Sequence, residues 1–149
     1  MADITPTVES FTDTDEDGVW TEGEPFDDVN GNGAYDPVWL AGFGHGRAAQ
    51  SVHDPISARA LVLEQGELRV GLVSLDLVGL FHTDVLTIRR AARELQLDHV
   101  MVATTHNHEA PDTMGIWGAT IAETGYDPEY VASVVAATIE ALAEAADGL

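Results

Sequence analysis

The segment 13–36 constrains this chain more than any other part of it, because it carries nine acidic side chains and no basic one. Like charges at this density repel one another, and such a block normally stays disordered in solution. Here, however, the acids are regularly spaced: Asp13, Asp15 and Asp17 alternate with other residues, and Gly18 follows. A segment with this charge can pack against a folded domain only if its carboxylates are neutralised.

Residues 13–24 match the pattern D-x-[DN]-x-[DN]-G-x5-E of a calcium-binding loop without a mismatch. In such a loop, alternate acids bind through carboxylate oxygens, a backbone carbonyl contributes, and a closing Glu binds with both oxygens. The predicted ligands are Asp13, Asp15, Asp17, the carbonyl of Val19, Thr21 directly or through water, and Glu24. The alternative interpretation is a solvated acidic loop that binds no ion.

A second loop of the same kind follows at 28–36. Its predicted ligands are Asp28, Asn30, Asn32, the carbonyl of Ala34, and Asp36. Position twelve of this loop is Trp39, so Asp27 or a more distant acid would have to close it. Pro6 precedes the two loops and Pro25 lies between them, which disfavours EF-hand helices. We therefore expect tandem structural Ca²⁺ sites in irregular loops.

The composition excludes several classes of protein. Across 149 residues, 26 Asp and Glu stand against six Arg and no Lys, which gives a formal net charge of −20. A chain this acidic lacks the basic face that nucleic acids or anionic membranes require. The absence of cysteine excludes disulfides and thiol chemistry. No apolar run has the length of a transmembrane segment, and the hydrophobic content of 45% indicates a globular domain.

The calcium loops favour an extracellular or periplasmic location, because extracellular modules tolerate weak calcium affinity. The first 20 residues do not read as a signal peptide. The acidic surface and the absence of lysine also suit the cytoplasm of a salt-adapted organism, which is the alternative location.

The rest of the chain has the pattern of an α/β fold. Apolar segments predict strands at 59–63, 68–75 and 99–104, and helical periodicity predicts helices at 83–95 and 128–146. This order, β-β-α-β-α, predicts a buried mixed sheet with flanking helices. The strands are almost continuously apolar, which is typical of burial on both faces.

Burial on both faces needs more layers than this chain supplies. We therefore expect part of a larger domain, completed by the remainder of a longer chain or by a homo-oligomer partner. The predicted organisation is an N-terminal extension (1–12), the calcium loops (13–37) and an incomplete α/β domain (38–149).

Chemistry-bearing side chains gather just after the strand at 99–104, where sites in α/β folds usually lie. His106 and His108 point the same way if the backbone stays extended, and neutral imidazoles are good zinc ligands. Asp76 follows the strand at 68–75, and we expect it beside His106 if the two strands are neighbours. Arg47 and Asp112 are candidates for binding a polar substrate group. The alternative is that these side chains only satisfy irregular backbone.

Four stretches, taken together, resemble the N-terminal part of the neutral/alkaline non-lysosomal ceramidase family. They lie at 42–47, 52–63, 73–77 and 103–112, the last containing Thr105-His106-Asn107-His108 and Pro111-Asp112. The resemblance implies a zinc-dependent amidase that cleaves the N-acyl bond of a lipid amide. It implies that His106 binds zinc and that His108 is a catalytic residue facing the substrate. Asp76 is a second catalytic candidate.

Two departures from the family pattern matter. Asn107 and Glu109 replace small hydroxyl residues, which leaves the choice between a lipid and another small-molecule amide open. The family's other zinc ligands, a further His, a Glu and a Tyr, lie downstream of the matched part, so we expect these 149 residues alone to be inactive. The leading hypothesis is a fragment of a zinc-dependent hydrolase. The alternative is a calcium-stabilised, non-catalytic binding or structural module.

Overall fold

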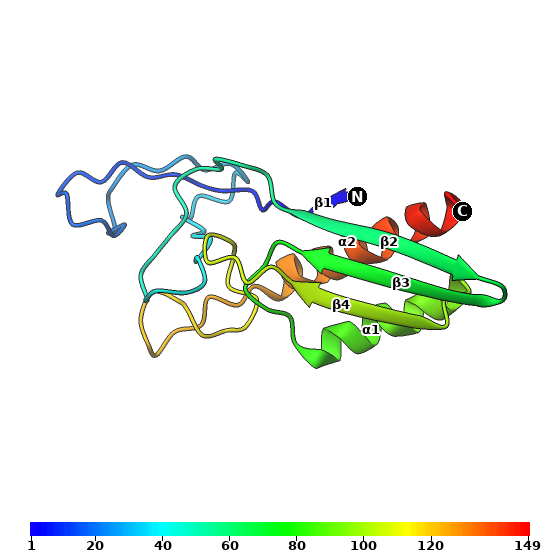
Figure 1. Ribbon diagram of the computed structural model, residues 1–149. Helices are drawn as coiled ribbons and strands as arrows, with labels where there is room; N and C mark the ends of the chain where they lie inside the picture. The colour runs from blue at the N-terminus through cyan, green and yellow to red at the C-terminus, as the bar shows by residue number, and fades with distance from the viewer.

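The computed structural model describes residues 1–149 and contains one four-stranded sheet and two helices (Figure 1). The elements are β1 (Ala2–Asp3), β2 (Ser57–Gln65), β3 (Leu68–Leu75), α1 (His82–Glu94), β4 (His99–Thr104) and α2 (Pro128–Asp147). The strands lie in the order β1-β2-β3-β4. β3 is antiparallel to β2 and parallel to β4. The predicted α/β class and mixed sheet are therefore confirmed, whereas the predicted order lacks β1.

The hairpin between β2 and β3 is closed by two residues, Gly66 and Glu67, because Gln65 pairs with Leu68. Gly66 has a φ of 64°, which a glycine adopts without steric cost. A glycine at the first position of a two-residue turn matches the right-handed twist of the flanking strands. The hairpin directs β3 back toward the end of the sheet where the long loops gather (Figure 1).

Helix α2 begins where its sequence predicts. The Asp127 carboxylate accepts hydrogen bonds from the backbone amides of Glu129 at 2.8 Å and Tyr130 at 3.2 Å. Pro128 occupies the first turn, where its missing amide hydrogen costs nothing. Neither α1 nor α2 combines the length and the apolar character that crossing a membrane requires.

The hydrophobic core lies between the sheet and the helices. Fully buried side chains such as Leu75 of β3, Ile88 of α1 and Leu142 of α2 meet there. Gly71 of β3 lets α2 approach closely, because a Cβ at this position would lie 2.8 Å from Leu142 Cδ2. The helices thus cover one face of the sheet.

The other face of the sheet is open within this chain, as expected if its cover comes from outside these 149 residues. Leu61 and Leu63 of β2 are 54% and 52% exposed, and Met101 of β4 is 63% exposed. Along β2, buried Val62 alternates with these exposed leucines. The apolar content of the strands therefore does not reflect two covered faces within these 149 residues. The expectation of a larger domain or an oligomer stays a prediction.

The acidic segment forms two irregular loops at the end of the molecule away from the hairpin (Figure 1). Aromatic side chains within and beside this segment form a small cluster. In it, Tyr35 contacts Phe11, Trp20 and Phe26 with ring centroids 5.1–5.8 Å apart. Phe11 and Phe26 also pair as an isolated antiparallel bridge. The segment is therefore anchored by aromatic packing rather than by helices or long strands.

Candidate functional site

The loop that follows β4 is held against the loop that follows β3. The amide of Thr105 donates to Leu75 O at 2.9 Å, and the amide of Asn107 donates to Leu77 O at 3.1 Å. These bonds continue the parallel pairing of β3 and β4 beyond the strand ends. They place His106 and His108 at the carboxyl edge of the sheet, as the sequence predicts.

The imidazole rings of His106 and His108 converge. Their Nε2 atoms lie 3.2 Å apart, with ring centroids 4.7 Å apart and planes at 68°. A tetrahedral zinc ion places two imidazole nitrogens about 3.3–3.4 Å apart, given zinc–nitrogen bonds of about 2.0–2.1 Å. The separation of the two Nε2 atoms therefore fits two ligands of one metal ion.

The backbone between the rings differs from the expectation. His106 has a φ of 62°, in the left-handed region, so the chain is not extended there. The two rings meet because of this kink rather than because side chains two residues apart share a face of a strand. Non-glycine residues in this region cost energy and are concentrated at functional sites.

A backbone carbonyl orients the His106 ring. Its Nδ1 lies 2.9 Å from Val78 O. A carbonyl only accepts hydrogen bonds, so Nδ1 carries the proton in the neutral ring and Nε2 keeps its lone pair. Metal-ligating histidines commonly have this arrangement, in which the second ring nitrogen is fixed by a carbonyl or carboxylate.

Arg47 was a candidate for substrate binding, but its guanidinium is engaged within the protein. Nη1 lies 3.2 Å from the carbonyl oxygens of Ala41, Gly42 and His108. Nη2 donates to both carboxylate oxygens of Glu109, at 2.8 and 2.9 Å. Arg47 therefore links the 41–47 loop to the loop that follows β4 and carries His106 and His108, here called the histidine loop.

Asp112, the other substrate-binding candidate, is 1% exposed. Its carboxylate accepts hydrogen bonds from the amides of Met114, Gly115 and Trp117, each at 2.9 Å. These bonds satisfy the carboxylate and shape the turn after Pro111. The structure thus gives Asp112 a structural role in this turn, and substrate binding by Asp112 stays a prediction.

Asp76 follows β3 where the β3–β4 pairing continues into the histidine loop, but no hydrogen bond joins its carboxylate to His106. Its carboxylate turns toward β2, where it accepts from Ser57 N and Ser57 Oγ at 3.1 Å and forms an ion pair with Arg59 at 2.8 Å. Burial alone would raise its pKa, but the hydrogen bonds from Arg59 and Ser57 outweigh burial and lower the pKa of Asp76. Asp76 is thus an ionised carboxylate held by β2.

A cavity of about 550 Å³ lies on the other side of the histidine loop. Asp76, Asn107 and Glu109 line it, together with apolar side chains such as Val52 and Ile56. His106 and His108 do not line this cavity. The alternating residues of the loop therefore face two directions, the histidines toward each other and Asn107 and Glu109 toward the cavity.

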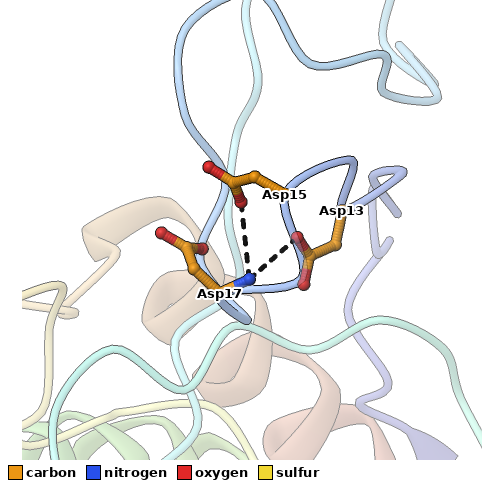
Figure 2. Close-up of side chains that lie close together, drawn as sticks. All are labelled: Asp13, Asp15 and Asp17. Atoms are coloured by element: carbon orange, nitrogen blue, oxygen red, sulfur yellow. Dashed lines mark hydrogen bonds between the residues drawn. The ribbon is translucent and has the colours of Figure 1, made fainter.

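The first predicted calcium loop brings three of its predicted ligands together (Figure 2). Asp13, Asp15 and Asp17 can each place a carboxylate oxygen within 4.8 Å of the others. The amide of Asp17 donates to the carboxylates of Asp13 and Asp15 at 3.2 and 3.4 Å. Desolvation within the cluster, and then the charge of Asp17, raise the pKa of Asp15. A cation at this point would relieve that repulsion.

The closing residue Glu24 does not join this cluster. Its carboxylate accepts from the backbone amides of Thr14 at 2.6 Å and Thr21 at 2.9 Å, and these bonds lower the pKa of Glu24. The amide of Val19, another predicted ligand residue, donates to the Asp17 carboxylate at 2.7 Å. Glu24 therefore stabilises the backbone of the loop through these hydrogen bonds.

The second predicted loop is organised around two carboxylates. Asp28 accepts from the amides of residues 31–33 at 2.7–3.1 Å. The side-chain amides of Asn30 and Asn32 both donate to Asp36 at 2.7 Å, and the Ala34 amide donates to Asn32 Oδ1. The side chains of Asn30, Asn32 and Asp36 thus lie together.

Glu9 is a residue that the sequence did not single out. It is 3% exposed, and its carboxylate accepts from the amides of Val29 at 3.0 Å and Asp36 at 2.9 Å. It therefore holds both ends of the second loop. No sequence pattern distinguishes Glu9 from the other acidic residues of the chain, which number 26 in all with it, so its burial could not be predicted.

Comparisons with models of protein families, with curated proteins and with solved structures found no match to this chain. Its function is therefore inferred from its own geometry and from the sequence resemblance.

Proposed function

We propose that this chain supplies a two-histidine zinc site to a hydrolase that resembles the neutral ceramidases and cleaves an N-acyl bond. The observation that carries the proposal is the 3.2 Å separation of His106 Nε2 and His108 Nε2. The Val78 carbonyl, which leaves the lone pair of His106 free at Nε2, supports it. The proposal extends the sequence expectation, because His108 becomes a second ligand rather than only a substrate-facing residue.

The donor set suits zinc chemically. Two neutral imidazoles are common zinc ligands, and catalytic zinc sites use three protein ligands and leave one position open. Zinc bound there would supply a water of lowered pKa and polarise a substrate carbonyl. By the resemblance, the missing ligands belong to a larger protein. His106 and His108 would hold the metal, and the Val78 carbonyl orients the His106 ring.

Metal binding tests the proposal directly. Titration with Co²⁺ or Zn²⁺, followed by calorimetry and by Co²⁺ absorption, should detect one site in the unmodified chain. His106→Ala and His108→Ala should each weaken binding by more than about tenfold, since even residues that only orient ligands contribute that much. His53→Ala is the matched control, because His53 is exposed and bonds only to Asp54.

The competing explanation of the short distance is a hydrogen bond from His108 Nε2 to His106 Nε2 with no role for a metal. In that case neither Co²⁺ nor Zn²⁺ would bind at the two rings, and His106→Ala and His108→Ala would bind as much metal as the unmodified chain. Binding that survives in both single variants would also overturn the zinc proposal.

The second candidate function is a calcium-stabilised binding or structural module. The carboxylates of Asp13, Asp15 and Asp17 within 4.8 Å of one another favour it. Millimolar Ca²⁺ should raise the melting temperature of the chain, and Asp15→Asn, which removes a ligand of the first loop only, should reduce the rise. Asp54→Asn, a change at an exposed acid outside the loops, should leave it intact. An unchanged melting temperature in Ca²⁺ would remove this candidate.

The two candidates are compatible, because the calcium loops and the histidine pair lie in different segments. In a hydrolase, the calcium loops would have a structural role and stabilise the fold. An extracellular or periplasmic location follows from this proposal, because weak calcium sites are filled there.

A further inference from the structure

The His108 ring occupies space that only a glycine at position 42 leaves free. A Cβ built on Gly42 would fall on the imidazole, closest to Nδ1 and 2.5 Å from Cγ. Carbon atoms in real structures do not approach so closely, so any side chain at this position displaces the ring. Gly42 also has a φ of 80°, which other residues rarely adopt.

Arg47 fixes the backbone on both sides of this contact. A single nitrogen, Nη1, lies 3.2 Å from the carbonyl oxygens of Ala41, Gly42 and His108. Because the Gly42 and His108 carbonyls share this donor, the guanidinium keeps Gly42 next to the His108 ring. The pairing of Nη2 with Glu109 orients the guanidinium from the histidine loop itself.

Phe43 completes the support of His108. Its ring meets the imidazole edge-on with centroids 4.8 Å apart, and the Arg47 guanidinium lies 5.3 Å from its centroid. Phe43 has a φ of 57° and is 82% exposed. An exposed aromatic ring in strained backbone is held there by its surroundings, here by Arg47 and His108.

We propose that Gly42 and Arg47 are positioning residues that set the His108 ring against His106 and so define the metal site. This inference rests on the proposed two-histidine zinc site and names the parts that form it. Neither residue contacts the metal. Gly42 acts by leaving space, and Arg47 acts by tying the two loops together.

Three glycine variants distinguish the steric effect of a Cβ on the His108 ring from the effect of a side chain at a positive φ. Gly42→Ala introduces both a positive-φ alanine and the contact with His108. Gly46→Ala introduces the positive φ, with only the Ala119 carbonyl nearby at 3.5 Å. Gly44→Ala introduces neither, because nothing lies within 4 Å of its Cβ. We expect Co²⁺ affinity to fall about 10- to 100-fold in Gly42→Ala, and to stay within about threefold in the two controls.

A metal-free readout keeps the inference separate from the zinc proposal. In the unmodified chain without metal, nuclear Overhauser contacts between the imidazole protons of His106 and His108 should be visible. They should vanish in Gly42→Ala and persist in Gly44→Ala. If no metal binds but these contacts behave as expected, the zinc proposal fails and the positioning role stands. If Gly42→Ala keeps both the contacts and the Co²⁺ affinity, the positioning role fails.

Arg47→Lys provides a second route if Gly42→Ala does not fold. A lysine keeps the charge but lacks the planar fork that bonds several carbonyls and a carboxylate at once. We expect its Co²⁺ affinity to fall about tenfold and the Co²⁺ absorption to change in shape, with a circular dichroism spectrum like that of the unmodified chain. Unchanged affinity and absorption in folded Arg47→Lys would overturn the role of Arg47.

Discussion

Arg59 and Asp76 form an ion pair of 2.8 Å that joins β2 to the end of β3. The pair lies at the edge of the sheet where the loops begin, and the Asp76 side chain is only 15% exposed while that of Arg59 is 53% exposed. Ser57 adds two hydrogen bonds at 3.1 Å to the same carboxylate. The lowered pKa of Asp76 follows from these contacts, which prevail over the opposing effect of burial.

The first prediction concerns acid stability. Because the pKa of Asp76 is lower in the folded state, its contribution is fully present above the unfolded value of about 3.9 and is lost as the pH falls through the folded value. Arg59→Gln should therefore lower the free energy of unfolding at pH 7 by about 1 kcal/mol or less, given the exposure of the pair. The loss should shrink below about pH 4.

Urea unfolding between pH 2 and pH 7 measures this effect. Arg90→Gln is the matched control, because Arg90 is exposed on α1 and forms no ion pair. A loss of stability in Arg59→Gln that is the same at every pH would show that the side chain acts by packing and not through the charge of Asp76.

The second prediction concerns the contact of the sheet with α2. Gly71→Ala places a methyl group 2.8 Å from Leu142 Cδ2, in a fully buried layer. We expect a loss of about 1–3 kcal/mol in the free energy of unfolding, which is typical of overpacking. Leu142→Ala removes the opposing side chain, so the double variant should lose less than the sum of the two single losses. Simple additivity in denaturant unfolding would argue against the contact.

Much of the fold could be predicted from the sequence because its elements are periodic and well delimited. The ranges 68–75 and 99–104 are confirmed, and Asp127 followed by proline marks the start of α2. β1 could not be predicted, since two residues show no periodicity and pair only because β2 lies beside them. Apolar character alone did not show which face the helices cover: Leu61 and Met101 lie on the uncovered face.

For the candidate site, the sequence pointed to two histidines but not to the backbone that brings their rings together. The spacing of His106 and His108 indicated a pair, whereas the left-handed backbone at His106 has no signature in the sequence. The roles expected of Arg47 and Asp112 depended on side-chain exposure, which neighbours in space decide. Arg47 bonds to the His108 carbonyl and the Glu109 carboxylate, and Asp112 accepts from the Trp117 amide; no sequence pattern indicated these contacts.

The third prediction concerns Glu9 and the second loop. Glu9→Ala removes the acceptors of the Val29 and Asp36 amides, which a carboxylate that is 3% exposed supplies. We expect a loss of about 2 kcal/mol in the free energy of unfolding, with faster hydrogen exchange at both amides. Glu16→Ala, at an exposed acid of the first loop, should change neither quantity. Unchanged exchange at Val29 in Glu9→Ala would contradict the role of Glu9 as the anchor.

The last prediction concerns the open face of the sheet. Leu61 is 54% exposed, while its neighbour Val62 is 5% exposed and belongs to the core. Leu61→Gln should therefore change the free energy of unfolding by no more than about 0.5 kcal/mol, whereas Val62→Ala should cost about 2 kcal/mol. Sedimentation of the unmodified chain at the concentration of the unfolding experiment belongs with this comparison. If Leu61→Gln costs as much as Val62→Ala, the face is covered in solution, and a concentration-dependent mass would show that another copy covers it.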